Sequence, residues 1–166
     1  DDFSGDTLDT FRWTQLDTNG TGTAGMSNEI DGGYYLTTNS NNNAAVEIAF
    51  ADTWNGGTNI RPFSHLGSTI IWVCKISSIS NMNFGSGMGE MARADGAGNN
   101  AVYTFLYGSN FGMRTCFSDG SQSNLDSGVS ADTNYHSHKM SCESTFASYT
   151  LDGVFTGTIT TNLPTT

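Results

Sequence analysis

Acidic residues at two places in the chain raise the question of glycoside hydrolysis. That reaction uses two carboxylates, one to attack or to activate water and one to protonate the leaving oxygen, and a strand presents both on one face at a spacing of two. Glu29 and Asp31 have this spacing, but Gly33 stands where a third acid of such a series would follow. Glu90 and Asp95 are five residues apart and would face opposite sides of a regular strand. The sequence therefore favours a protein that is not an enzyme.

The histidines suggest structure more than catalysis. His136 and His138 share one face of a predicted strand with Met140 and Cys142. We expect both to be buried imidazoles that help to close a core. The alternative is a two-histidine metal site, but no carboxylate stands at ligand spacing beside them to complete it. His65 is a lone loop residue, and the Gly-x-Ser-x-Gly motif of serine hydrolases does not occur.

The stretch LDTNGTG offers oxygen ligands for calcium. Asp17, Asn19 and Thr21 alternate with residues that allow a tight loop, although the terminal acid of an EF-hand is missing. An ordinary turn uses the same letters, so both interpretations stay open. Structural Ca²⁺ is the one cofactor that the sequence suggests, and none is required.

Aromatic residues provide the means to bind carbohydrate. Aromatic faces stack on sugar C–H surfaces, and nearby amides and carboxylates bond hydroxyl groups. The strand-like run AVYTFLY places the rings at 103, 105 and 107 on one face, as core or as a platform, and a Trp lies among turn formers in DTWNGGTN. The predicted ligand-binding residues are Trp54, Asn55, Asn59, Tyr103 and Tyr107.

Composition limits the partners. Only 13% of the 166 residues are charged, and the formal net charge is −10, which excludes nucleic-acid phosphates and anionic membranes as partners. There is no apolar run of roughly 20 residues that would span a bilayer, and DDFSGDTLDT does not resemble a signal peptide. Most of the polar residues are uncharged, and the chain also has 10 Phe, 6 Tyr and 3 Trp. This combination is typical of ordered extracellular all-β proteins. We therefore expect a chain that works outside the cell, on a cell surface or in a virion.

The three cysteines allow at most one internal disulfide. Cys74, inside TIIWVCKI, is predicted to be a buried small hydrophobe. Cys116 and Cys142 form a disulfide only if their strands are neighbours, and spacing does not decide this.

Short β-rich runs separated by turn clusters predict an all-β, two-sheet antiparallel β-sandwich in a single domain over residues 1–166. Asp152-Gly153 predicts a type I′ hairpin, because both central residues of that turn need positive φ. The predicted strands are residues 32–38, 44–50, 69–76, 101–107, 112–117, 135–142, 148–151 and 154–160.

The sequence resembles the concanavalin A-like lectin and glucanase superfamily. The resemblance lies in DDFSGDTLDTFRWTQL, IDGGYYLTT and GSTIIWVCKIS, and above all in NYHSHKMSCESTFASYTLDGVFTGTITTNLP. It implies a jelly roll in which Tyr135-His136, Asp152-Gly153 and Asn162-Leu163-Pro164 occupy the family's late-strand positions. It also implies a further strand after Pro164, supplied by this chain or by a neighbouring subunit.

Three functions follow as hypotheses. The first is a non-catalytic module for glycan binding or adhesion, with carbohydrate as its partner. The second is a structural subunit of a virion, filament or other surface assembly, as a homo-oligomer or through strand complementation. The third, a glycoside hydrolase or lyase, lacks the Glu-x-Asp-x-Glu strand of the family's glucanases.

Overall fold

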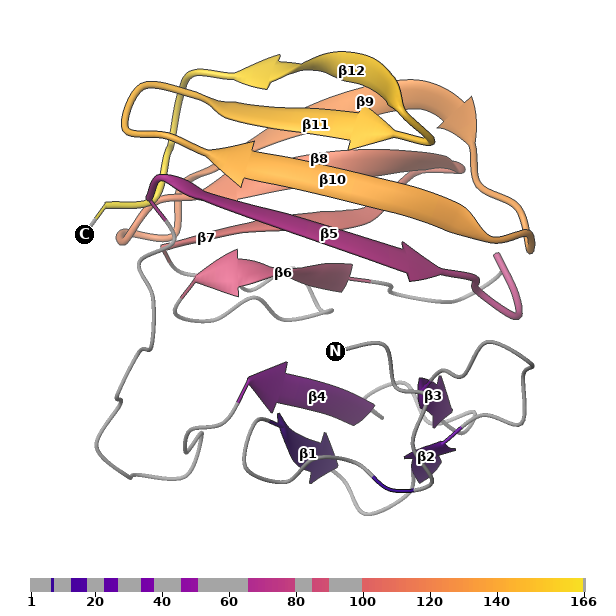
Figure 1. Ribbon diagram of the computed structural model, residues 1–166. Helices are drawn as coiled ribbons and strands as arrows, with labels where there is room; N and C mark the ends of the chain where they lie inside the picture. The colour runs from indigo at the N-terminus through magenta and orange to yellow at the C-terminus, as the bar shows by residue number, and fades with distance from the viewer. Residues whose placement is uncertain are drawn as a thin grey trace. The chain divides into compact units, whose positions relative to one another are not determined.

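The computed structural model describes residues 7, 13–17, 23–26, 34–37, 46–50, 66–79, 85–89 and 100–165 (Figure 1). All regular structure in these residues is β, and every strand pair is antiparallel, which confirms the predicted fold class at this level. Within them, no helix is long and apolar enough to span a membrane. The chain divides into two compact units, residues 1–62 and 63–166.

The first unit contains two short antiparallel pairs. β1 (Trp13–Asp17) pairs with β4 (Val46–Phe50), and β2 (Thr23–Met26) pairs with β3 (Tyr34–Thr37). Tyr35 of β3 lies across Gly25 of β2, where a Cβ would come within 3.0 Å of the tyrosine hydroxyl. Glycine at this position lets the ring rest on the neighbouring backbone.

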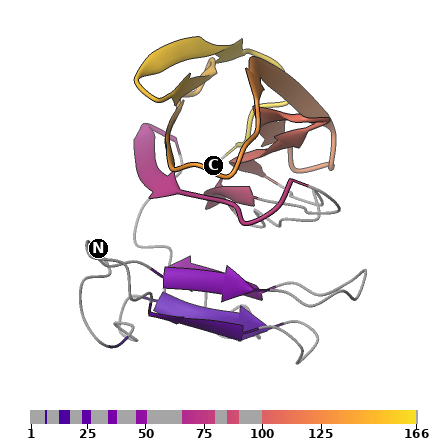
Figure 2. The same ribbon diagram turned by 90° about the vertical axis from the view of Figure 1, so that its right-hand side faces the viewer.

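The second unit is built from two four-stranded sheets, with strand orders β12-β11-β10-β5 and β6-β7-β8-β9. Figure 2 shows the two curved sheets from the side. Their strands are β5 (Ser68–Cys74), β6 (Gly85–Gly89), β7 (Ala101–Tyr107), β8 (Asn110–Cys116), β9 (Gln122–Ser130), β10 (His136–Cys142), β11 (Ala147–Leu151) and β12 (Val154–Ile159).

One apolar core joins the two sheets. Val102 and Met113 come from the β6–β9 sheet, and Met140, Tyr149 and Ile159 come from the other sheet. All are buried, because period-two alternation turns one side of each strand toward the other sheet. The second unit is thus sandwich-like, with both sheets contributing to the interior.

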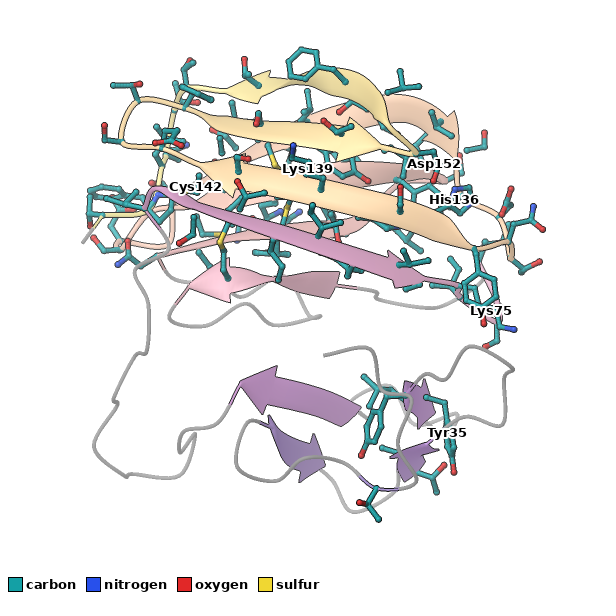
Figure 3. All side chains as sticks on the ribbon, viewed as in Figure 1. Tyr35, Lys75, His136, Lys139, Cys142 and Asp152 are labelled. Atoms are coloured by element: carbon teal, nitrogen blue, oxygen red, sulfur yellow. The ribbon has the colours of Figure 1, made fainter. Side chains whose placement is uncertain are left out.

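The hairpin at Asp152-Gly153 has the predicted geometry. The φ angles are 50° at Asp152 and 78° at Gly153, and β11 pairs with β12 on either side. Asp152 stands at this tip in Figure 3. The sequence-based prediction of a type I′ turn is confirmed, because both central φ angles are positive.

After β12, the chain crosses from one sheet to the other. Thr161 accepts a hydrogen bond from Thr115 Oγ1 at 3.1 Å through its carbonyl oxygen, and Asn162 Nδ2 donates to the Gln122 carbonyl at 3.0 Å. Asn100 then binds Thr165 twice, because its Nδ2 donates to the Thr165 carbonyl and its Oδ1 accepts from the Thr165 amide. Residues 160–165 therefore strap the β11–β12 hairpin to β8, β9 and the start of β7. The strand expected beyond Pro164 stays a prediction.

Two strands of the second unit escaped prediction. β9 begins at Gln122, inside the polar stretch SDGSQSN, whose residue types are typical of a turn, and β6 is the glycine-rich GSGMG. Val129 is the one β-branched residue in these two strands, and neither strand has an aromatic residue, although both residue classes favour strands. Both form because β7 and β8 present their backbones for pairing.

Candidate functional site

The candidate site lies on the face of the β6–β9 sheet that points away from the shared core. Alternation along β7 turns Val102 into that core and places Tyr103, Phe105 and Tyr107 on the opposite side. We call this side the aromatic face. It confirms the prediction that the three rings share one side of a strand.

The three rings differ in exposure along the row. Tyr103 is 1% exposed, Phe105 is half-buried and Tyr107 is 44% exposed. Neighbouring rings meet edge to face, with centroids 6.4 Å apart for Tyr103 and Phe105 and 5.7 Å apart for Phe105 and Tyr107. Such pairs are a favourable geometry for aromatic quadrupoles. Tyr107 is therefore the ring with the most surface to offer a ligand.

Arg114 of β8 is held on this row by several partners. Its Cζ lies 4.3 Å from the centroid of the Phe105 ring, a cation–π distance. Its Nε donates to Asn124 Oδ1 at 2.7 Å, and Nη1 donates to the Tyr103 hydroxyl at 3.4 Å. The guanidinium is thus fixed in place before any ligand arrives.

Tyr103 stays a neutral phenol beneath this arginine. Burial raises the pKa of Tyr103 to about 12, although the hydrogen bond from Arg114 lowers it. Its hydroxyl also lies 3.8 Å from the Cys116 thiol. Tyr103 thus supports the face as a packed polar ring and is not available as an acid near neutral pH.

Polar groups of β9 border the aromatic row. Gln122, Asn124 and Asp126 alternate outward on this strand and are exposed. Asn110 Nδ2 donates to both carboxylate oxygens of Asp126, at 3.0 and 3.2 Å, and the Gly128 amide donates to Oδ1 at 2.8 Å. These bonds orient the carboxylate beside the rings.

Glycine at position 112 lets rings and carboxylate come together. Gly112 pairs with Phe105 on one side and with Asp126 on the other. A Cβ at this position would lie 2.8 Å from the Leu125 carbonyl oxygen, 3.1 Å from Tyr107 Cβ and 3.3 Å from Phe105 Cε1. No side chain therefore separates Phe105 from Asp126 in this cross-strand row.

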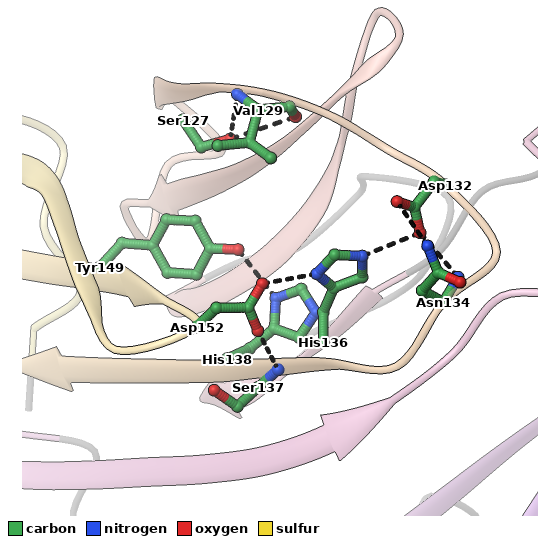
Figure 4. Close-up of polar contacts among 9 residues, drawn as sticks. All are labelled: Ser127, Val129, Asp132, Asn134, His136, Ser137, His138, Tyr149 and Asp152. Carbon is green, nitrogen blue, oxygen red and sulfur yellow. Dashed lines mark hydrogen bonds and ion pairs between the residues drawn. The ribbon is translucent and has the colours of Figure 1, made fainter.

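A second polar group is the histidine clamp of Asp132, His136 and Asp152, whose contacts are drawn in Figure 4. Figure 3 shows His136 and Asp152 at one end of the sandwich-like unit. His136 donates from Nδ1 to Asp152 Oδ2 at 2.7 Å and from Nε2 to Asp132 Oδ1 at 2.9 Å. Asp152 Oδ1 also accepts the Ser137 amide at 2.8 Å. Because both ring nitrogens are engaged by carboxylates, the imidazole holds two turns together and is unsuited to act as a base.

The clamp sets the charge of its members. Burial lowers the pKa of His136, but the hydrogen bonds to Asp132 and Asp152 outweigh burial, so this pKa is raised above 6.5. The bonds from His136 in turn lower the pKa of both carboxyl groups. The clamp therefore favours the imidazolium, held between two carboxylates, over the neutral ring.

His138 lies two residues along β10 and is fully buried. Its ring stacks on Trp72, with centroids 5.4 Å apart, and its Nδ1 is hydrogen-bonded to the Tyr149 hydroxyl at 2.8 Å. Burial, followed by the charge of His136, lowers its pKa to about 4. The predicted role of a buried core imidazole is confirmed for His138, whereas His136 is a partly exposed clamp.

The structure places only some of the predicted ligand-binding residues. Tyr103 and Tyr107 lie on the aromatic face, and Trp54, Asn55 and Asn59 lie outside the described residues. Sequence reasoning missed Arg114, Asn124 and Asp126. The signal for Asn124 and Asp126 was their alternation across a polar stretch that looked like a turn.

Of the candidate calcium ligands and acidic pairs, the structure describes only one residue. Asp17 ends β1, whereas Asn19 and Thr21 lie outside the described residues, as do Glu29, Asp31, Glu90 and Asp95. In the described ranges, no three His, Cys, Asp or Glu side chains gather as metal ligands.

The cysteines at 116 and 142 are both free and buried, and they belong to different apolar clusters. Cys74 is also free, and it is half-buried, so the prediction of a buried small hydrophobe is confirmed only in part. Its strand is at the edge of its sheet, where fewer neighbours cover each side chain.

Comparisons of the chain with family models, with curated proteins and with solved structures gave no match.

Proposed function

We propose that this chain is a non-catalytic, concanavalin A-like jelly-roll module that binds glycans, working outside the cell, on a cell surface or in a virion. One observation carries the proposal: an exposed tyrosine continues a row of rings that is bordered by fixed hydrogen-bonding groups. Tyr107 offers a ring for sugar C–H groups, and Asn124 and Asp126 lie on the same side of the sheet. Stacking combined with amide and carboxylate partners is the chemistry that recognises sugars.

Preorganisation supports the same proposal. Arg114, Asn110 and Asp126 already hold one another or the rings, so a ligand does not have to order them. Less entropy is lost when a surface of this kind binds. The face is therefore suited to bind a ligand without first being rearranged.

A panel of soluble polysaccharides, including dextran, mannan, galactan and xylan, tests the proposal. Binding is measured by isothermal titration calorimetry with the full chain. We expect Tyr107→Ala to weaken binding by about two- to tenfold, since aromatic stacking contributes about 0.5 to 1.5 kcal/mol. Tyr135→Ala is the matched control, because Tyr135 is 52% exposed but lies outside the aromatic face. No binding by the wild type, or equal losses in both variants, would refute the proposal.

A second candidate function, a subunit of a surface assembly, is favoured by the outward side of the β5–β10–β11–β12 sheet. In the described residues of these strands, Lys139 is the sole charged side chain on that side, which also bears Ile71, Val73 and Phe155 at 64 to 65% exposure. Two copies of a chain with net charge −10 repel each other least when they meet through sides whose described strand residues carry no carboxylate.

The occupant that fits this side is a second copy of the chain. Sedimentation velocity should then show concentration-dependent association that Ile71→Lys abolishes. Val154→Lys is the control, because Val154 is 67% exposed but pairs with inward-facing Leu151. A monomer at all concentrations would exclude this candidate. No observation favours the hydrolase or lyase hypothesis, whose acids lie outside the described residues.

A further inference from the structure

We infer that the aromatic face selects uncharged, hydroxyl-rich glycans and rejects acidic ones, with Asp126 as the specificity-determining residue. This inference rests on the proposed glycan-binding function and adds the chemical class of the ligand. It depends on the different ways in which Arg114 and Asp126, the two charged residues described on this face, are held.

The positive charge of Arg114 is directed into the protein. Its guanidinium lies over Phe105 and donates to Asn124 and to the buried Tyr103. An anionic sugar would have to displace or share these contacts to form a bidentate pair with the arginine. Arg114 is therefore a positioning residue for the rings, and its charge is a weak attractant for acidic ligands.

The negative charge of Asp126 is directed outward. Its side chain is exposed, and its described donors, the Asn110 amide and the Gly128 amide, are both neutral. A carboxylate has about four lone-pair sites, so acceptor capacity remains for sugar hydroxyl groups. Hydrogen bonds to an ionised acceptor are stronger than those between neutral groups.

The position of Asp126 brings this charge to the ligand. Tyr107 pairs with Asn110, and the Asn110 side chain binds Asp126. A sugar that stacks on Tyr107 is therefore one side chain away from the carboxylate. A uronic or sulfated sugar in that place would put a second anion near Asp126, inside a molecule of net charge −10. Like charges repel at short range, and this repulsion is strongest at low ionic strength.

The test compares paired polysaccharides on the full chain: dextran with dextran sulfate, and galactan with polygalacturonate. In buffer of low ionic strength, we expect the wild type to bind the neutral member at least about tenfold more tightly. Asp126→Asn keeps the shape and should reduce that preference at least about threefold, chiefly by improving binding of the acidic member. Added salt should narrow the wild-type preference, because it screens exposed charges.

Asp119→Asn is the matched control, because Asp119 is another exposed carboxylate that accepts bonds in a turn, from the amide and hydroxyl of Ser121. It should leave the preference unchanged. Circular dichroism of each variant checks folding, and the salt series on the wild type tests the inference without any variant. Equal binding of both members, or a preference that Asp126→Asn does not change, would overturn the inference while glycan binding stands. Failure to bind any polysaccharide would overturn the proposed function and the inference together.

Discussion

His136 Nδ1 and Asp152 Oδ2 lie 2.7 Å apart and join strand β10 to the turn between β11 and β12. The same carboxylate accepts the Ser137 amide through its other oxygen. Asp152 therefore has two roles: its backbone adopts the positive φ of the turn, and its side chain fixes that turn to the neighbouring strand. Asparagine could supply the first role but not the negative charge of the second.

Asp152→Asn should lower the free energy of unfolding by about 1 kcal/mol near pH 5.5, a typical value for a partly exposed ion pair. The raised pKa of His136 means that the pair stabilises the fold at pH values below 6.5 and that this contribution is lost as pH rises through the folded-state value. The pKa values of the Asp132 and Asp152 carboxyl groups are lowered in the fold. The stability that these carboxylates contribute is therefore fully present above their ordinary pKa of 3.8 and is lost as pH falls through their folded-state values. Urea unfolding at pH 5.5 and 9 should therefore show a larger effect of the substitution at pH 5.5. Asp119→Asn serves as the control, and an equal cost at both pH values would contradict the ion-pair interpretation.

His138 should make the protein less stable as pH falls from 6.5 toward 4. The unfolded chain binds a proton at His138 below 6.5, but the folded chain does not until about 4. The cost is on the order of 2 to 3 kcal/mol over this interval. The rings of Trp72, Phe111 and Tyr149 pack around the His138 ring. Two charged groups act on it: His136 lowers its pKa, and Asp152 raises it.

His138→Phe keeps a flat ring beside Trp72 and removes the titrating group. The slope of unfolding free energy against pH between 4 and 6.5 should become less positive than in the wild type, because the variant no longer loses stability through protonation of this residue. Chemical denaturation at four pH values measures this slope, whatever the absolute stability of the variant. An unchanged slope would show that His138 does not titrate as a buried neutral imidazole.

Gly87→Ala should destabilise the second unit more than Gly108→Ala. An added Cβ at Gly87 would overlap the Val102 carbonyl oxygen and Tyr103 Cβ on the paired strand, and these atoms cannot move without disturbing the sheet. Overpacking of this kind costs about 1 to 3 kcal/mol or more. At Gly108, nothing lies within 4 Å, and the cost arises from a φ of +63°, about 1 kcal/mol. Thermal unfolding of both variants gives the comparison, and a smaller loss for Gly87→Ala would disprove the close approach of β6 to β7.

Asn100→Ala should release the segment around Thr165. The Asn100 side chain makes both a donated and an accepted hydrogen bond with the Thr165 backbone, and it is 4% exposed. Leaving buried partners unsatisfied costs about 1 to 3 kcal/mol. Amide hydrogen exchange at Thr165 should accelerate, and Asn100→Asp should accelerate it as well, because a buried carboxylate oxygen would then face the Thr165 carbonyl oxygen. Exchange that is the same in all three proteins would mean that the strap is not held by Asn100.

The sequence predicted the fold where local signals and packing agree. The Asp152-Gly153 turn and the rings of β7 were predicted because type I′ turns and period-two alternation are local properties. β9 was not predicted, because its sequence alone does not show which side is inward. Ser123, Leu125 and Ser127 form that side only through contacts with β8 and with Thr161 of the crossing segment. The histidine clamp was not predicted for a similar reason. Asp132 and Asp152 come close to His136 only when the turns and strands that carry them have folded.

The crossing of residues 160–165 has a mechanical consequence. A force applied at the C-terminal end would first load the hydrogen bonds of Asn100, Thr115 and Gln122 to this segment, and not the ladder between β11 and β12. Because those bonds belong to the β6–β9 sheet, tension would be shared between both sheets at once. The hairpin of β11 and β12 would therefore resist peeling away strand by strand.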